Sequence, residues 1–192
     1  MLFRSIVSDD RRASEVIRRL RELLMRRKVQ RQPVDPNECI REVLELQHSN
    51  LIERNVLAEV RLAARIPTVM ADRIQLQQVL LNLIVNACDA MAQREPRERL
   101  LRIVSVAGED GAVRIDICDN GPGVEDPEAI FAPFFSTKSG GIGLGLAICR
   151  TIIASHRGRL WASNNAARGA TLHIWMPPTA GQSPGVADAR RQ

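Results

Sequence analysis

The sequence has no tyrosine, few other aromatic residues and no long hydrophobic run. Aromatic side chains make up only 3% of the 192 residues. No apolar stretch reaches the roughly 18 residues that a membrane-spanning helix needs, and no signal peptide opens the chain. We therefore expect no membrane contact. With 45% hydrophobic and 26% charged residues, the composition predicts one globular domain with an additional segment.

Cysteine and histidine are also scarce, and their spacing argues against a metal centre built from them. The four cysteines form no C-x-x-C pair, and the three histidines are too far apart in sequence to suggest a shared metal ion. We interpret the cysteines as reduced packing residues of a cytoplasmic protein. The residues concerned are Cys39, Cys88, Cys118, Cys149, His48, His156 and His173.

Positive charge is concentrated near the N-terminus. Residues 1–31 carry ten basic and four acidic side chains, whereas the whole chain has a net charge of +5. A basic arm is one signature of nucleic-acid binding. Because the rest of the chain lacks a basic face, we expect no nucleic-acid partner. Salt-dependent binding of duplex DNA would be needed to restore that interpretation.

Residues 72–91 predict a helix around which the rest of the chain is organised. Asp72 and Gln75 have the spacing of a capping box, so the helix should begin at Asp72. Apolar residues recur at helical spacing and predict a broad buried face. This face consists of Leu76, Val79, Leu80, Leu83, Ile84, Ala87 and Met91.

The other face of this helix carries a polar stripe of Gln78, Asn82, Asn86 and Asp89. Asparagine in a helix interior costs about 0.5 kcal/mol relative to alanine, because its side chain competes with the backbone for hydrogen bonds. One interpretation is that the amides tie the helix to a loop. The other is that the stripe lines a polar pocket and offers amide oxygens to a hard cation such as Mg²⁺.

The N-terminal third contains two further predicted helices. Residues 3–28 predict one long helix with a heptad seam, which is half of a helical hairpin or of a dimer bundle, or simply packs on its own domain. Prolines in residues 32–36 predict a break and a domain boundary. Residues 37–53 predict a helix and residues 56–62 a half-buried strand. The apolar side of the helix at 37–53 consists of Ile40, Val43, Leu44, Leu46 and Leu51.

An acidic residue follows a predicted strand hairpin at 101–107 and 112–118. Asp119 continues the alternation of Val113, Ile115 and Ile117, so its carboxylate should point toward the core. A buried carboxylate is costly without a hydrogen-bond donor, and a glycine-rich turn at 120–123 follows directly. Asp119 either caps this turn or accepts a bond from a ligand, for which the exocyclic amine of an adenine would fit.

Residues 125–145 show no periodicity, and so long a loop inside a compact domain indicates function. Three of the four phenylalanines lie in it, at 131, 134 and 135, and we expect them to anchor it while its glycines let it move. The glycines lead into a helix predicted at 144–155, whose first N–H groups suit phosphate oxygens. A strand pair at 159–163 and 170–176, with its turn at Gly169, closes the domain, and a disordered tail begins after Pro177.

Four segments resemble the ATP-binding catalytic domain of bacterial sensor histidine kinases, within the GHKL ATPase superfamily. QLQQVLLNLIVNACDAM resembles the family's N box, DICDNGPGV its G1 box, IFAPFFSTK its F box and GIGLGLAICR its G2 box. RASEVIRRLRELL also resembles the second helix of the family's dimerisation hairpin. The pattern is most similar to the oxygen- or redox-sensing kinases that have a PAS input.

The resemblance implies an α+β fold. This would be a two-layer α/β sandwich of the Bergerat type, with helices on one face of a mixed sheet, preceded by one long helix. Residues 1–31 would be the second hairpin helix, residues 32–177 the ATP-binding domain and residues 178–192 a disordered tail. The implied cofactors are ATP and Mg²⁺, with Asn86 as the Mg²⁺ ligand and Asn82 and Asp89 in support.

The same resemblance implies how the nucleotide is held. Asp119 would bind adenine in a pocket shaped by Gly121 and Gly123, and Thr171 would reach the base through water. The residues that would contact the phosphates are Lys138, Gly141, Gly143, Leu144, Gly145 and Leu146.

The sequence departs from the family pattern in two places. The family's phosphoacceptor His, followed by an acid and Pro-Leu, has no counterpart, and the segment between Gly123 and Ile130 is short. We therefore expect a fragment of a longer kinase that phosphorylates a His on an absent helix. Its partners would be that helix, a response regulator receiver domain and a second copy in a homodimer. The alternatives are a non-catalytic ATP- or ADP-binding regulatory module and an anti-sigma-type serine kinase on the same fold.

Overall fold

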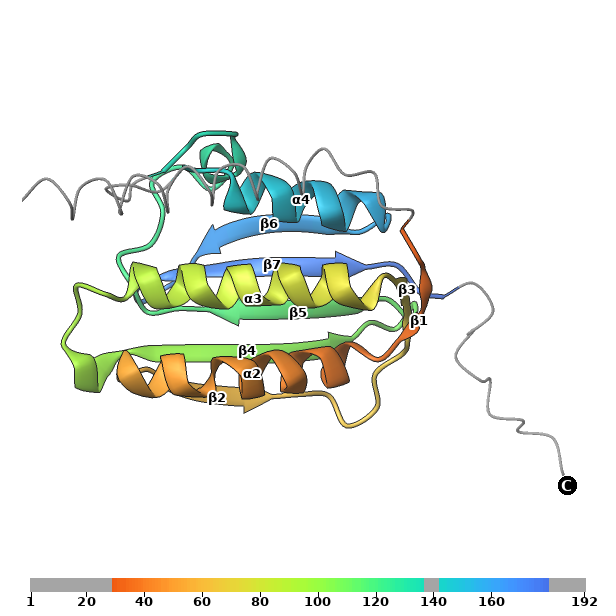
Figure 1. Cartoon of the computed structure of the whole chain (residues 1–192), viewed down its shortest axis with the longest axis horizontal. Helices are drawn as coiled ribbons and strands as arrows, with labels where there is room; N and C mark the ends of the chain where they lie inside the picture. The colour runs from red at the N-terminus through yellow and green to blue at the C-terminus, as the bar shows by residue number, and fades with distance from the viewer. Residues whose placement is uncertain (1–28, 137–141, 180–192) are drawn as a thin grey trace, which may run out of the picture.

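In the computed structural model, residues 29–136 and 142–179 are described, and they form a five-stranded sheet with three helices packed on one face (Figure 1). The helices are α2 (Pro36–Glu53), α3 (Arg73–Ala90) and α4 (Gly145–Ser155). This arrangement confirms the predicted α+β sandwich. The long helix expected at 3–28 lies outside the described residues. Neither α2, α3 nor α4 combines the length and hydropathy that a membrane span requires.

The five-stranded sheet is mixed and has the strand order β2-β4-β5-β7-β6. β2 runs parallel to β4, and the other neighbours are antiparallel. Both predicted hairpins are present, as β4–β5 and as β6–β7. The strands are β2 (Leu57–Arg61), β4 (Leu100–Ala107), β5 (Val113–Cys118), β6 (Arg159–Asn164) and β7 (Ala170–Met176). Short 3₁₀ helices lie at Pro96–Glu98 and Ala129–Phe131.

The sequence did not predict a second, two-stranded sheet formed by β1 (Gln32–Val34) and β3 (Val69–Ala71). β1 occupies part of the segment interpreted as a break. Its central proline is tolerated because an edge strand does not need every N–H. The predicted boundary is therefore a strand that is attached to the body of the fold, and Asp35 follows it as the N-cap of α2.

Helix α3 lies in the middle of the helical layer (Figure 1), and its predicted apolar face is fully buried. The Asp72 carboxylate caps the helix by accepting hydrogen bonds from the N–H groups of Ile74 (3.1 Å) and Gln75 (3.2 Å). The return bond of the predicted capping box does not form. Instead, the Asp72 N–H donates to Nε2 of His156 at 2.9 Å. His156 is 3% exposed, so this histidine holds the start of α3 against the end of α4.

One predicted core residue of α2 is wrong. Ile40, Val43 and Leu51 are buried, but Leu46 is 73% exposed. Leu46 follows Ile40 by six residues, which places it roughly 120° around the helix from Ile40, at the margin of the buried stripe. Near the predicted end of the domain, Thr179 Oγ1 donates a hydrogen bond to the carbonyl of Thr68 at 2.7 Å, and residues 180–192 of the expected tail lie outside the described residues.

Candidate functional site

The polar stripe of α3 contacts α4 at Asn82. Its Nδ2 donates to Sγ of Cys149 at 3.2 Å. A Cβ added at Gly145 would lie 2.9 Å from the same nitrogen, so this glycine lets the first turn of α4 approach α3. Burial raises the pKa of the Cys149 thiol to about 12 despite the hydrogen bond from Asn82, so the sulfur is neutral. Asn82 therefore ties α3 to another helix, and not to a loop as the simpler interpretation of the stripe expected.

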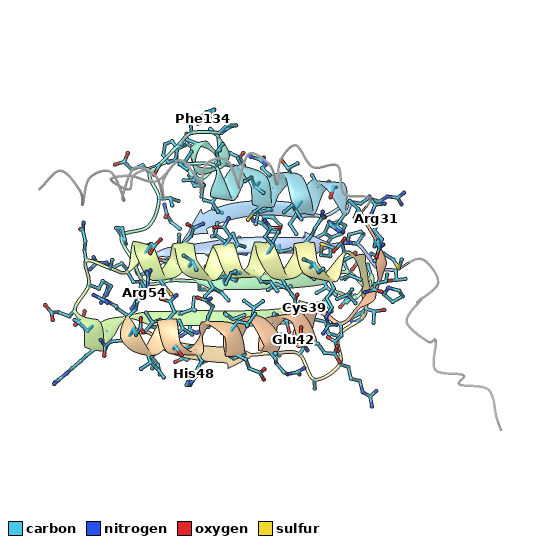
Figure 2. All side chains as sticks on the ribbon, in the orientation of Figure 1. Arg31, Cys39, Glu42, His48, Arg54 and Phe134 are labelled. Carbon is cyan, nitrogen blue, oxygen red and sulfur yellow. The ribbon has the colours of Figure 1, made fainter. Side chains whose placement is uncertain are left out.

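At the other end of the stripe, Asp89 forms an ion pair with Arg54 at the end of α2 (Figure 2). Arg54 Nη1 lies 2.5 Å from Asp89 Oδ1, and this bond is the main reason that the pKa of Arg54 is raised. Arg54 is itself held, because its Nε donates to Asn50 Oδ1 at 2.9 Å. Asn86 lies one helical turn from both Asn82 and Asp89. Sequence reasoning missed Arg54, because 35 residues separate it from Asp89.

The carboxylate of Asp119 points into the core, as strand alternation predicted. The residue is 7% exposed. Its Oδ1 accepts hydrogen bonds from the N–H of Gly121 at 2.8 Å and, more weakly, of Ala170 at 3.4 Å. The turn-capping role is thus confirmed, and both bonds end on the same oxygen. Burial raises the pKa of Asp119 above its usual value, and the hydrogen bonds from Gly121 and Ala170 oppose that shift.

Two glycines bring the turn after β5 close to its neighbours. A Cβ at Gly121 would lie 2.9 Å from both the carbonyl oxygen of Ala90 and Oδ1 of Asp119, so this turn touches the end of α3. Gly123 has φ +88°, and a Cβ there would lie 2.8 Å from Oδ1 of Asn164. The turn after β5 therefore lies against the end of α3 and the Asp119 carboxylate. A side chain at Gly121 or Gly123 would clash with these neighbours or with Asn164.

Thr171 does not join the group around Asp119. In the β5–β7 register, Cys118 pairs with Thr171. Because the strands are antiparallel, the next residue of β5, Asp119, lies beside Ala170, on the core face of the sheet. Alternation places the Thr171 side chain on the opposite face of the sheet. There its hydroxyl donates to Asn165 Oδ1 at 2.6 Å. Asn165, which the sequence did not suggest, also donates to the carbonyl of Asp119 at 2.8 Å. The expectation that Thr171 reaches the base beside Asp119 is therefore wrong, because its hydroxyl lies on the other face of the sheet and bonds to Asn165.

Helix α4 starts at Gly145, directly after the glycine-containing segment, as the sequence predicted. No side chain caps its first turn at Leu144. Gly143 has φ +70°, and its carbonyl accepts a hydrogen bond from the N–H of Phe134 at 3.0 Å. A Cβ at Gly143 would lie 2.5 Å from the Phe134 backbone, so only glycine fits this approach. Gly145 and Leu146 form the first turn of α4, whereas Lys138 and Gly141 lie outside the described residues.

The expectation that all three phenylalanines anchor the long loop is wrong. Phe131 is buried at 4% exposure, and the guanidinium of Arg150 lies 5.1 Å from its ring centroid. Phe134 and Phe135 are 73% and 41% exposed. Phe134 has φ +67° in the turn that contacts Gly143, and Figure 2 shows its side chain at the rim of the molecule. One phenylalanine therefore anchors the loop, and two remain at the surface.

These groups fit a nucleotide and a divalent cation. The uncapped N-terminus of α4 offers N–H groups and a positive dipole end to phosphate oxygens. The amide oxygen of Asn86 on the adjacent helix is a hard donor of the kind that Mg²⁺ accepts. The buried Asp119 carboxylate, beside glycines at which a side chain would clash, suits a planar base with an amine.

Residues 71–180 match the family described as histidine kinase-, DNA gyrase B- and HSP90-like ATPase. The chain is 38% identical to the sensor protein FixL of Bradyrhizobium diazoefficiens over 168 residues, which cover 86% of this chain and 33% of FixL. It is also 38% identical to the C4-dicarboxylate transport sensor protein DctS of Rhodobacter capsulatus, covering 91% of this chain and 27% of DctS. The chain thus spans only about a quarter to a third of the length of these relatives.

Solved structures show the same likeness. The nucleotide-free catalytic domain of histidine kinase ThkA matches with a TM-score of 0.69 and 33% identity, covering 78% of this chain and 97% of that domain. ThkA in complex with the response regulator protein TrrA matches with a TM-score of 0.76 and 29% identity, covering 91% of this chain and 49% of that chain.

Proposed function

The chain belongs to the family of histidine kinase-, DNA gyrase B- and HSP90-like ATPases, and from this premise we propose that it is the catalytic part of a sensor histidine kinase. It would bind ATP with Mg²⁺ and position the γ-phosphate for attack by a histidine on a helix outside this chain. The contribution of the domain is then positioning and charge neutralisation, without a covalent intermediate of its own.

The geometry of Asp119 carries the proposal. Both protein hydrogen bonds end on Oδ1, so we assign Oδ2 to the exocyclic amine of adenine. Guanine would direct a carbonyl at the same oxygen and leave two acceptors facing each other, which a buried site rejects strongly. We assign Gly121 and Gly123 to the border of the base. A Cβ at Gly121 would lie 2.9 Å from the carbonyl oxygen of Ala90, and one at Gly123 would lie 2.8 Å from Oδ1 of Asn164.

We assign the phosphates to the start of α4. The backbone of Gly143, Leu144, Gly145 and Leu146 would hold them, with Lys138 and Gly141 completing the loop. Asn86 would be the metal ligand, and Asn82 and Asp89 would fix its helix to α4 and to Arg54 of α2. Bound Mg²⁺ supplies neutralisation of the charge on the phosphate oxygens.

The organisation of the whole protein is part of the proposal. Residues 1–31 would be the second helix of a dimerisation hairpin, residues 32–177 the ATP-binding domain and residues 178–192 a tail. The partners would be the phosphoacceptor helix, a response regulator receiver domain and a second copy. The response regulator in the ThkA complex supports the second of these. Four free cysteines suit a cytoplasmic location.

Calorimetric titration tests the nucleotide site. Wild-type protein should bind ATP more tightly with Mg²⁺ than without it, and should bind GTP weakly. Asn86→Ala should abolish the Mg²⁺-dependent part of the affinity. Gln77→Ala is the matched control, because it removes an amide on the same helix that bonds to Glu42 of α2 instead. Equal affinity for ATP and GTP in the wild type would refute the adenine assignment. Unchanged Mg²⁺ dependence in Asn86→Ala would refute the metal assignment.

A second assay separates the kinase from its alternatives. A hairpin fragment with a phosphoacceptor His, added in trans with labelled ATP, should become labelled with an acid-labile phosphate. ATP binding without transfer would favour a non-catalytic regulatory module. Acid-stable label on serine would favour an anti-sigma-type kinase on the same fold.

A further inference from the structure

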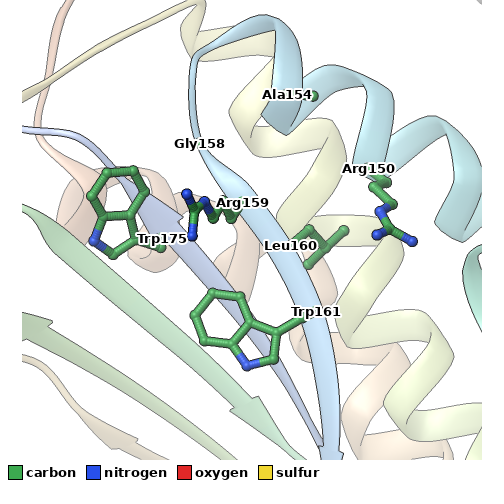
Figure 3. A pocket seen from close by; sticks show the side chains of 7 residues that line it. All are labelled: Arg150, Ala154, Gly158, Arg159, Leu160, Trp161 and Trp175. Carbon is green, nitrogen blue, oxygen red and sulfur yellow. The ribbon is translucent and has the colours of Figure 1, made fainter. Parts of the chain in front are cut away.

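A groove of about 600 Å³ lies beside β6, on the edge of the sheet and next to α4 (Figure 3). Its lining includes Arg150 and Ala154 from α4, Arg159 and Trp161 from β6, and Trp175 from β7. None of these residues belongs to the proposed nucleotide site. The volume lies within the range of pockets that hold a ligand or a pair of side chains.

Both tryptophans of the sequence line this groove, and the chain has no tyrosine. In the β6–β7 register, Trp175 lies opposite Arg159, and Trp161 lies opposite His173, with which it stacks at 4.9 Å between ring centroids. Their neighbours Leu160, Ala162, Leu172 and Ile174 are buried in the core. Alternation therefore places the side chains of Trp161, His173 and Trp175 on the opposite face of the sheet. Figure 1 shows that α2, α3 and α4 leave this face of the sheet uncovered. Such a face usually carries polar side chains. Two tryptophans beside arginines are instead the composition of a protein-binding hot spot.

The groove is positively charged. Arg159 has no ion-pair partner within residues 29–136 and 142–179. Arg150 pairs with Glu128 at 3.0 Å, but the two side chains are 46% and 70% exposed, so this pair is weak and can be exchanged. On the open face, the carboxylate of Asp116 already contacts Arg114 (3.1 Å) and Nδ1 of His173 (2.8 Å). The groove therefore complements an anionic partner.

We propose that this groove binds an acidic, extended segment of a partner protein. An apolar side chain of the segment lies against Trp161 and Trp175, and flanking carboxylates meet Arg150 and Arg159. β6 is the last strand of the described five-stranded sheet, so the groove lies along a sheet edge, which suits an extended chain. The proposal does not depend on the nucleotide site.

Tryptophan fluorescence of the whole chain reports on the groove directly, because the only two tryptophans lie in it. The probe is a synthetic peptide of alternating Glu and Leu, compared with the same peptide carrying Lys in place of Glu. The acidic peptide should change the emission saturably, with an affinity that falls as salt is raised. The basic peptide should cause no saturable change.

Charge reversal tests the specificity. Arg159→Glu should weaken the acidic peptide by roughly tenfold or more, because like charges then face each other. It should leave ADP affinity unchanged, which also shows that the variant is folded. Arg65→Glu is the matched control, since it changes the net charge equally at an exposed position outside the groove and should bind as the wild type does.

Three outcomes would overturn the proposal. The first is no saturable response to the acidic peptide. The second is equal weakening by Arg159→Glu and Arg65→Glu, which would indicate attraction by net charge alone. The third is a saturable response to benzoate but not to the peptide, which would make the groove a site for a small aromatic anion.

Discussion

Replacing Asp119 by asparagine should weaken nucleotide binding while leaving the empty protein as stable as before, or more stable. The carboxylate is 7% exposed and its desolvation raises its pKa, so its charge is unfavourable in the free protein at neutral pH. Asparagine keeps an oxygen that can accept the bonds from Gly121 and Ala170. It loses the charged acceptor that we assign to the adenine amine.

The expected loss of affinity follows from that one hydrogen bond. Removing a buried, charged acceptor costs about 1–3 kcal/mol. At 1.4 kcal/mol per factor of ten, the Kd for ADP should rise roughly 5- to 140-fold. Calorimetric titration of ADP into wild type and Asp119→Asn measures this directly.

The stability effect has a definite pH dependence. Because the pKa of Asp119 is raised in the folded protein, the folded state binds more protons than the unfolded chain between pH 3.8 and the folded-state pKa. The contribution of Asp119 to the free energy of unfolding of the wild type is therefore lost as the pH rises through that window. Asparagine does not titrate. The free energy of unfolding of Asp119→Asn, minus that of the wild type, should thus grow as the pH rises above about 3.8 and then level off.

Asp116 provides the matched control, because it is also a buried carboxylate of β5 but is paired with Arg114 and His173. Asp116→Asn should destabilise the protein by about 1–3 kcal/mol in urea unfolding. If Asp119→Asn destabilises as much as Asp116→Asn, the carboxylate is structural. If it binds ADP as tightly as the wild type, the adenine contact is wrong.

Three further predictions concern stability and are measured by urea or thermal unfolding. Gly169→Ala should destabilise by more than about 1 kcal/mol, because Gly169 has φ +89° and the new Cβ would lie 2.1 Å from a backbone carbonyl oxygen; equal stability would contradict this. Ser105→Ala should cost about 1–3 kcal/mol, because the buried Asn37 Oδ1 loses its donor at 2.7 Å, whereas Ser105→Thr is the control that retains a hydroxyl. Leu46→Ser should change stability by less than about 0.5 kcal/mol, whereas Leu83→Ala should cost about 2–5 kcal/mol, and similar effects would argue against the observed packing of α2.

Features that depend on short-range periodicity could be predicted from the sequence. The apolar face of α3, the two hairpins and the inward direction of Asp119 follow from spacings of two, three and four residues. Leu46 was mispredicted because apolar and polar residues alternate irregularly along α2, so the sequence does not show which side of the helix is buried. Thr171 was mispredicted because the face of a strand residue depends on register, and β7 has buried residues on both faces at that end.

Contacts between distant elements could not be predicted. The capping box illustrates why. Asp72 and Gln75 have the spacing that would let the helix satisfy its own first N–H groups, yet the Asp72 N–H donates to His156, 84 residues later. Both arrangements satisfy the same local requirement. Only the packing of α4 beside α3 decides between them, and this packing is a property of the whole core.

The two interpretations of the α3 stripe turn out to be compatible. Asn82 is held by Cys149 of α4, and Asp89 is held by Arg54 at the end of α2, so the stripe is fixed to a neighbouring helix on each side of Asn86. A metal ligand must be positioned to within a fraction of an ångström by its surroundings. Asn86 lies one turn from each fixed point. The contacts of Asn82 and Asp89 tie α3 into the fold. The same contacts would hold Asn86, which lies between them, in place as a metal ligand.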